Sequence, residues 1–355
     1  MPSRPRTLVG APDTPYTLKI VGAPGSPYSR KLRAVLRYRR IPHLWVQQAS
    51  RDAQDIPPVP VQLIPVLVFP GEDGEPDTAA IDTTPLIRRL ETEYPERSVI
   101  PDDPAMAFVD ALLEDYADEW LTKAMFHYRW AFAPDVEKAK RVLPLWGRWD
   151  VSDEQVAPFS EMFSARQIER LWVVGSNETT GSVIEASYRR YLELLDAHLS
   201  SQPFLLGARP ASSDFGAYGQ LTQLALFDPT SAAVTLATAP RIVAWVEVVE
   251  DLSGSEPAAT GWTPRDAVPD TLRALLAEVG RVYAPFLLAN AEALGNGADE
   301  VTCEIDGKPW VQKPFPYQGK CLQSLRAGYA GLSTGDREGV DAVLAGTGCE
   351  VLLRD

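Results

Sequence analysis

The feature that most constrains the fold is a short apolar run that ends in a glycine-containing loop and leads directly into a helix. Residues 17–21 are rich in β-branched side chains, and residues 22–25 contain two glycines and a proline. Ser26 suits a helix N-cap, and Pro27 suits the first helical position. Apolar residues then recur at helical spacing, at Tyr28, Leu32, Val35 and Leu36. The pattern predicts a β-strand, a turn and a helix that begins at Ser26.

The predicted start of this helix has the chemistry of an anion site. A helix N-terminus carries amide donors and a partial positive charge, and both favour a negatively charged group. Such a position lowers the pKa of a thiol from about 8.5 toward neutrality. Ser26 is therefore a candidate for holding a small thiol as the reactive thiolate. The alternative is a helix cap without a ligand, which typically contributes about 1 kcal/mol to stability.

Length and charge narrow the possible partners. The chain has 355 residues, which predicts two domains, and its net charge of −14 opposes binding to nucleic acid or to an anionic membrane surface. No apolar run approaches the roughly 20 residues of a membrane span. Residues 1–15 lack the apolar centre of a secretory signal, so we expect a flexible arm there.

The cysteines and histidines indicate neither disulfides nor a metal. Three cysteines are an odd and sparse set, which is typical of reduced thiols in the cytoplasm. His43, His127 and His198 lie far apart in the sequence and lack carboxylate or cysteine neighbours at ligand spacing. We therefore expect a cytoplasmic protein without a metal site.

Three motifs, in a fixed order along the chain, carry a resemblance to a known family. They are Ser26-Pro27-Tyr28, residues 63–68 with Ile64-Pro65, and residues 81–87 with Asp82-Thr83. With these motifs and a helical remainder, the chain resembles the glutathione transferase superfamily. The resemblance extends over residues 16–130 and 183–252.

The resemblance implies an α+β thioredoxin-like N-terminal domain followed by an all-α glutathione transferase-like C-terminal domain. We expect the first domain at residues 16–97 and the second at residues 104–256, with an insertion within residues 131–180. Beyond the resemblance, we expect residues 257–355 to form a helical extension packed on the second domain. The extension contains Asp306-Gly307 between two β-type runs, which predicts a β-hairpin.

The resemblance also implies a site for glutathione as a co-substrate. Ser26 matches the catalytic residue that donates a hydrogen bond to the glutathione sulfur and so favours the thiolate. Ile64, before the cis-proline Pro65, would pair with the peptide backbone of the ligand. Asp82 and Thr83 match the pair that receives the γ-glutamyl end.

Aromatic residues near the expected domain boundary are candidates for a second pocket. They are Tyr28, Tyr116, Trp120 and Tyr128. Together with Ser26 they predict an enzyme that activates the glutathione thiol for attack on a small apolar electrophile. The alternative for these aromatics is that they pack the core between the domains. A homodimer is expected from the resemblance.

A second function from a different class stays open: a non-catalytic binding or interaction protein with the glutathione transferase fold. Leu63 stands where the family often has Lys, and Asp82 is shorter than the common Glu. The role of residues 257–355 is not given by the resemblance. These departures favour the non-catalytic alternative, whereas Ser26, Ile64 and Thr83 oppose it.

A dense basic run follows Ser26 within this acidic chain. It consists of Arg30, Lys31, Arg33, Arg37, Arg39 and Arg40. The run predicts a solvated helix face or a dimer seam, and the alternative is a positive field that supports an anionic thiol.

Overall fold

The N-terminal part folds around a four-stranded mixed sheet. The structure, a computed structural model, describes residues 17–71, 75–147, 149–258 and 261–354, so the predicted arm over residues 1–15 lies outside it. The strands are β1 (Leu18–Gly22), β2 (His43–Gln47), β3 (Val66–Phe69) and β4 (Thr78–Ala80). They lie in the order β2-β1-β3-β4, with β1 parallel to β2 and antiparallel to β3.

Two helices complete the predicted thioredoxin-like domain. They are α1 (Pro27–Tyr38) and α2 (Thr83–Glu93), and a single 3-10 turn, η1 (Arg51–Ala53), replaces the second helix of such folds. The predicted apolar stripe of α1 is fully buried at Leu32, Val35 and Leu36, in the same core as Leu18 and Ile20 of β1. Each such side chain contributes about 1.5–3 kcal/mol when it leaves water. The stripe therefore fixes which face of α1 turns to the sheet.

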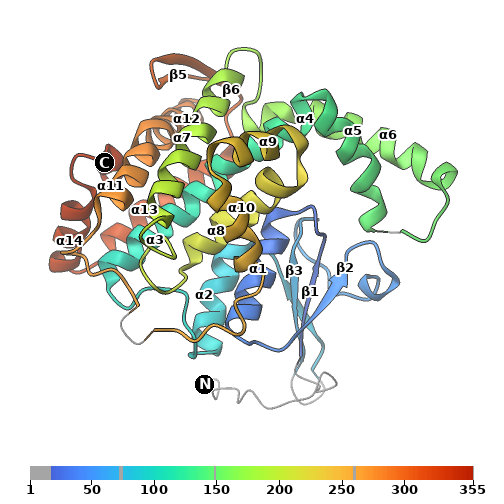
Figure 1. Ribbon diagram of the computed structural model, residues 1–355, viewed down its shortest axis with the longest axis horizontal. Helices are drawn as coiled ribbons and strands as arrows, with labels where there is room; N and C mark the ends of the chain where they lie inside the picture. The colour runs from blue at the N-terminus through green and yellow to red at the C-terminus, as the bar shows by residue number, and fades with distance from the viewer. Residues whose placement is uncertain (1–16, 72–74, 148, 259–260, 355) are drawn as a thin grey trace.

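The remainder of the described chain is almost entirely helical, as predicted (Figure 1). The second part contains α3 (Pro104–Tyr116), η2 (Ala117–Leu121), α4 (Thr122–Ala131), α5 (Ala133–Val142), η3 (Pro144–Trp146), α6 (Asp153–Glu169), η4 (Leu171–Val174), α7 (Gly181–Leu199), α8 (Ser212–Leu221), η5 (Thr222–Phe227), α9 (Pro229–Thr238) and α10 (Pro240–Val249). Since α2 ends at Glu93 and α3 begins at Pro104, we propose that residues 98–103 join the first two domains. In Figure 1, α6 projects from the side of the molecule opposite the C-terminal extension.

The C-terminal extension shares one apolar core with the helical domain. Its elements are α11 (Asp270–Glu278), η6 (Val279–Tyr283), α12 (Ala284–Asn296), β5 (Val301–Ile305), β6 (Lys308–Gln312), α13 (Pro316–Ala330), α14 (Thr334–Leu344) and η7 (Cys349–Leu353). The predicted hairpin is confirmed: β5 and β6 are antiparallel, and Asp306 and Gly307 have φ angles of 54° and 72°. A two-residue turn that matches the twist of its strands needs positive φ at both positions, which Asp tolerates and Gly favours.

Three arginines of the basic run join α1 to the end of α10 instead of facing solvent. Arg30, Arg33 and Arg37 all pair with the carboxylate of Glu250, at the end of α10, with N–O distances of 3.1, 3.1 and 2.6 Å. Burial acts to raise the pKa of Glu250, but its bond from Tyr218 and the nearby guanidinium groups leave it lowered. The predicted solvated face is therefore wrong for these three arginines.

A buried aspartate organises the start of α8. Asp214 is fully buried, and its carboxylate accepts hydrogen bonds from the amides of Leu205 and Ala211, both at 2.8 Å. Ala211 is the N-cap and has no side-chain acceptor, so only the Asp214 half of a capping box is present. Asp110 of α3 instead accepts from the amide of Ser213, at 2.9 Å. The start of α8 is thus tied to α3.

We expect Asp214→Asn to lower the free energy of unfolding by about 1–3 kcal/mol. The amide of Asn would turn an NH₂ group toward a backbone donor and leave that buried amide unpaired. Urea unfolding followed by circular dichroism measures the change, with Asp299→Asn, at an exposed position, as the control. Equal midpoints for the two variants would contradict a structural role for the Asp214 carboxylate.

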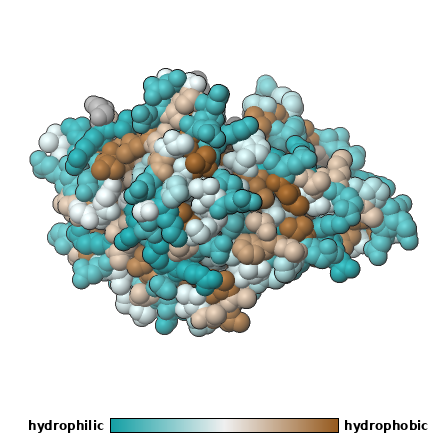
Figure 2. Space-filling view, turned by 90° about the horizontal axis from the view of Figure 1, so that it is seen from above, coloured by the Kyte–Doolittle hydropathy of each residue, from teal (hydrophilic) through white to brown (hydrophobic). Residues whose placement is uncertain are grey.

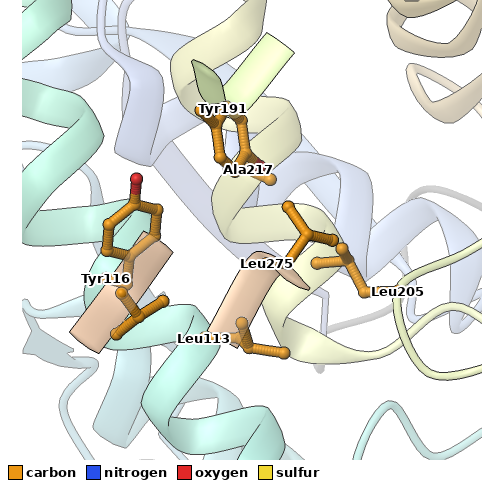
Figure 3. A pocket seen from close by; sticks show the side chains of 7 residues that line it. Leu113, Tyr116, Tyr191, Leu205, Ala217 and Leu275 are labelled. Carbon is orange, nitrogen blue, oxygen red and sulfur yellow. The ribbon is translucent and has the colours of Figure 1, made fainter. Parts of the chain in front are cut away.

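The helical domain also holds a small void, which is not a ligand site. It has a volume of about 10 Å³, room for about one water-sized probe. It lies between α3, α7, α8 and α11 (Figure 3) and is lined by Leu113, Tyr116, Tyr191, Leu205, Ala217, Leu275 and Val279. The lining is apolar and the space is too small for any organic ligand.

The face seen from above is mostly hydrophilic, with hydrophobic patches between the charged side chains (Figure 2). Across the part of the chain that the structure describes, no single helix combines the length and apolar character that a membrane span needs. Helices α9 and α10 reach that length and character only as a pair, and they are bent by 113° where they meet.

Candidate functional site

The loop before α1 is held by hydrogen bonds from both domains. Arg30 Nε and Gln223 Nε2 both donate to the carbonyl of Pro24, each at 3.1 Å. Arg129 Nη1 donates to the carbonyl of Gly25, also at 3.1 Å. Gln223 lies on η5 and Arg129 on α4, so the helical domain helps to set the position of the loop that leads into α1.

Arg129 is itself fixed by a buried ion pair. Its Nε and Nη2 atoms donate to the two carboxylate oxygens of Asp228, both at 2.9 Å, and Nη2 also donates to Gln223 at 2.7 Å. Asp228 is fully buried and Arg129 is 4% exposed. Burial raises the pKa of Asp228, and the Arg129 guanidinium opposes that rise. The two-point contact holds the cation in one orientation beside the loop.

Ser26 stands at the N-terminus of α1, as predicted, and is half-buried. Its Oγ accepts a hydrogen bond from the Ser29 amide at 3.2 Å, which is the N-cap contact. No contact among the described residues uses the hydrogen of the Ser26 hydroxyl, so that group is available to donate to a ligand. Pro27 has no amide hydrogen and the Ser29 amide is taken, so the helix start offers fewer amide donors than expected.

A cavity of about 420 Å³ lies beside Ser26, within the size range of small-molecule sites. Its polar lining consists of Ser26, Gln47, Gln48, Thr122, Arg129 and Gln167. Its apolar and aromatic lining includes Tyr28, Ile64, Met125, Phe126, Trp130, Leu143, Trp146, Phe159 and Phe163. An apolar molecule with one or two polar groups fits this lining, and its reactive atom would lie near the Ser26 hydroxyl.

The insertion between α4 and α7 forms the outer wall of this cavity. A Cβ atom on Gly25 would lie 2.5 Å from the Trp146 ring and 2.7 Å from Leu143 Cδ2, so the insertion packs directly on the loop before Ser26. Only glycine allows this close approach. Phe159 and Phe163 reach the cavity from α6, the green helix that projects in Figure 1.

Helix α4 divides its aromatic side chains between the cavity and the core. Phe126, Arg129 and Trp130 are three and four residues apart, lie on one face and line the cavity. Tyr128 lies on another face, where its ring stacks on Phe132 with centroids 5.2 Å apart. Tyr128 is 1% exposed, so the structure does not bring it to the cavity as expected.

Tyr116 and Trp120 also lie in the core, outside the cavity lining. The Tyr116 ring contacts Tyr283 at 5.9 Å, and the Trp120 ring contacts Trp310 at 5.3 Å. Both partners belong to the C-terminal extension, which covers the face of α3 and η2 that we expected to meet a substrate. Of the four predicted pocket aromatics, the cavity lining contains only Tyr28, whose hydroxyl donates to the Asp118 carbonyl at 2.8 Å.

The residues predicted to bind glutathione lie at two places. Ile64 lines the cavity with Ser26, and the Ile64–Pro65 peptide bond is cis. Asp82 and Thr83 lie at the start of α2 and are absent from the cavity lining. Thr83 is buried, whereas Asp82 has a φ of 75° and accepts a hydrogen bond from Tyr317 Oη at 2.9 Å.

The N-terminal sheet and its helices are similar to a known family. Residues 20–98 match the family model of the glutathione S-transferase N-terminal domain. This region is therefore similar to a glutathione S-transferase N-terminal domain. Ser26, Ile64, Asp82 and Thr83 all belong to it.

Solved structures that are similar to this chain include glutathione transferases and a β-etherase. One is a glutathione transferase family member from Pseudomonas fluorescens Pf-5 with two glutathione molecules bound: 15% identity, 66% of this chain and 88% of that chain covered, TM-score 0.40. A second is a glutathione S-transferase from Methylobacterium radiotolerans in complex with glutathione sulfonate: 17% identity, 70% and 98% covered, TM-score 0.40. A third is a β-etherase from Sphingobium sp. strain SYK-6: 19% identity, 72% and 98% covered, TM-score 0.46. Comparison with curated proteins gave no match.

Most of the residues that line the cavity lie outside residues 20–98, the region that matches the family model. Sequence analysis did not single out Trp146, Phe159, Phe163 and Gln167, which line this cavity. No local sequence pattern indicated that the insertion folds back on the loop before Ser26. Over the described ranges, no three potential metal-ligating side chains come together.

Proposed function

We propose that this protein binds glutathione, or a closely related γ-glutamyl thiol, and activates its sulfur for attack on a small apolar electrophile. The observation that carries the proposal is the placement of Ser26. Its hydroxyl lies at a helix N-terminus, has no acceptor among the described contacts, and lines a cavity of about 420 Å³ with aromatic walls. The match of residues 20–98 to a glutathione S-transferase N-terminal domain supports a thiol as the ligand of that hydroxyl.

In the proposed chemistry, Ser26 stabilises the thiolate anion and does not act as a base. The thiol loses its proton to solvent, and the Ser26 hydroxyl donates a hydrogen bond to the thiolate. The sulfur then forms a bond to the electrophilic carbon, while a leaving group departs with its electron pair or the pair moves onto an adjacent acceptor atom. Arg129 holds the loop through Gly25 and so keeps the hydroxyl in place. The aromatic lining favours an apolar electrophile and keeps water from it.

Calorimetric titration with glutathione tests the binding step, and conjugation to an activated aryl halide tests the chemistry. We expect saturable binding at or below millimolar thiol, and turnover that depends on the protein. The variant Phe163→Ala enlarges the cavity and leaves Ser26 unchanged. It should raise KM for the aryl halide several-fold and leave thiol affinity unchanged, since Phe163 belongs to the aromatic wall. Absence of saturable thiol binding would remove the proposed function.

A non-catalytic binding protein is the second candidate, and one observation favours it. The carboxylate of Asp82, expected to face the ligand, already accepts a hydrogen bond from the protein's own Tyr317. Thiol binding without any Ser26-dependent turnover would support this second candidate.

We further propose a homodimer, which light scattering coupled to size-exclusion chromatography would test by molar mass.

A further inference from the structure

A hydrogen bond joins the start of α2 to the C-terminal extension, at the position where we expect the amino end of the thiol to bind. Tyr317, in the first turn of α13, donates its hydroxyl hydrogen to Asp82 Oδ2 at 2.9 Å. The Asp82 side chain makes no cap contact with its own helix. Its carboxylate is therefore directed toward the C-terminal extension and not toward α2. No family motif in the sequence indicated this partner, because Tyr317 lies 235 residues away from Asp82.

The start of α13 is fixed, so Tyr317 is held in place and is not a loose flap. Phe315, the N-cap of α13, exchanges two hydrogen bonds with the buried amide of Asn290, at 2.8 and 3.1 Å. On the other side, Gln318 Nε2 donates to Glu119 of η2 at 3.0 Å. The chain is thus anchored at Phe315 and at Gln318, on either side of Tyr317, while Tyr317 itself is 41% exposed.

The surroundings of this contact are acidic. Burial raises the pKa of the Tyr317 hydroxyl, and the neighbouring carboxylates of Asp82 and Glu119 raise it further. A tyrosine that is neutral throughout the physiological range can donate to a carboxylate but brings no positive charge. The negative charge of Asp82 thus remains available to attract a cation, such as the ammonium group of a γ-glutamyl ligand.

We propose that Tyr317 is a positioning residue for the amino end of the thiol substrate: its hydroxyl holds one oxygen of Asp82 and so orients the other for the ligand's ammonium group. The inference rests on the proposed function. It also gives the C-terminal extension a role in thiol recognition. A carboxylate offers about four acceptor positions, so one bond from Tyr317 leaves room for the ligand. Fixing the side chain in advance reduces the ordering that ligand binding must otherwise impose.

The test compares two thiols that differ only in the amino group. They are glutathione and N-glutaryl-cysteinylglycine, which is glutathione without its α-amino group. We expect Tyr317→Phe to weaken glutathione binding about three- to tenfold in calorimetry, as is usual for the loss of one orienting hydrogen bond. The same variant should change the affinity for the analogue less than about twofold, because the analogue does not use Asp82.

A matched control exists on the same helix. Tyr329, in the last turn of α13, donates to Asp341 at 2.8 Å, and Tyr329→Phe removes the same kind of bond far from Asp82. It should leave both affinities unchanged. In an Asp82→Asn background, Tyr317→Phe should lose most of its effect, since the charge it positions is absent.

The outcomes separate the two proposals. If the parent binds neither thiol, the proposed function and this inference both fall. If the parent binds glutathione but Tyr317→Phe leaves its affinity unchanged, weakens both thiols equally, or tightens glutathione, then the positioning role alone is overturned. Tightening would show that Tyr317 competes with the ligand for Asp82.

Discussion

Replacing Ser26 with alanine is expected to lower kcat/KM for thiol conjugation about a hundredfold, the usual cost of losing one preorganised donor to a developing anion. The physical reason is that the Ser26 hydroxyl is the donor that lines the cavity at the start of α1. The thiolate would then lose its hydrogen bond and its pKa would rise. The pH dependence of the thiolate absorbance in the protein–thiol complex measures the pKa, and the steady-state conjugation rate measures kcat/KM.

The control must separate catalysis from helix capping, because Ser26 does both. Ser333 caps α14 through the same contact, an amide hydrogen bond of 3.2 Å to its Oγ, and it lies in the extension. Ser333→Ala should cost about 1 kcal/mol of stability, as should Ser26→Ala, but should leave the rate unchanged. Ser26→Thr keeps hydroxyl and cap and should retain most of the activity. An unaltered rate in Ser26→Ala would exclude Ser26 from the chemistry.

Removing Arg129 is expected to lower the free energy of unfolding by about 3–5 kcal/mol, the largest stability effect that we predict. Arg129→Met leaves the carboxylate of Asp228 buried without its charged partner. It also removes the bond to the Gly25 carbonyl, so the loop before Ser26 loses an anchor. Guanidinium unfolding measures the stability, and kcat/KM should fall together with it.

The double variant Arg129→Met/Asp228→Asn shows whether the buried charge causes the loss. With both charges removed, we expect recovery of more than half of the lost stability, since an uncharged buried pair leaves no unpaired ion. Activity should not recover to the same extent, because the bond to Gly25 is still missing. If the double variant is no more stable than Arg129→Met, the loss comes from packing against Phe227, whose ring lies 5.1 Å from the guanidinium.

Local features of the candidate site could be predicted, and its walls could not. The start of α1 at Ser26 follows from a short-range pattern, whereas the cis peptide before Pro65 is implied by the family resemblance, and the structure confirms both. The second-substrate aromatics were a different kind of prediction. Tyr116 and Trp120 have the right chemistry and spacing, yet the extension buries them.

The same contrast holds for charge. The run of basic residues predicted a solvated helix face or a dimer seam. In the structure, three of its arginines form ion pairs with Glu250, at the end of α10. A charged face of a helix has the same pattern whether water or a distant carboxylate covers it. Pattern alone therefore identified a charged face and could not identify its partner.

By itself, the sequence determined the elements with strong local signals: the strand and helix around Ser26, the hairpin at Asp306-Gly307, and the helical character of the second half. Tertiary structure decided which segments cover one another, including the insertion over Gly25 and the reach of Tyr317 to Asp82. The physical reason is that capping, turn geometry and hydrophobic periodicity act over a few residues. The cover of a face depends on packing between segments far apart in the chain, and this information is spread over the whole molecule.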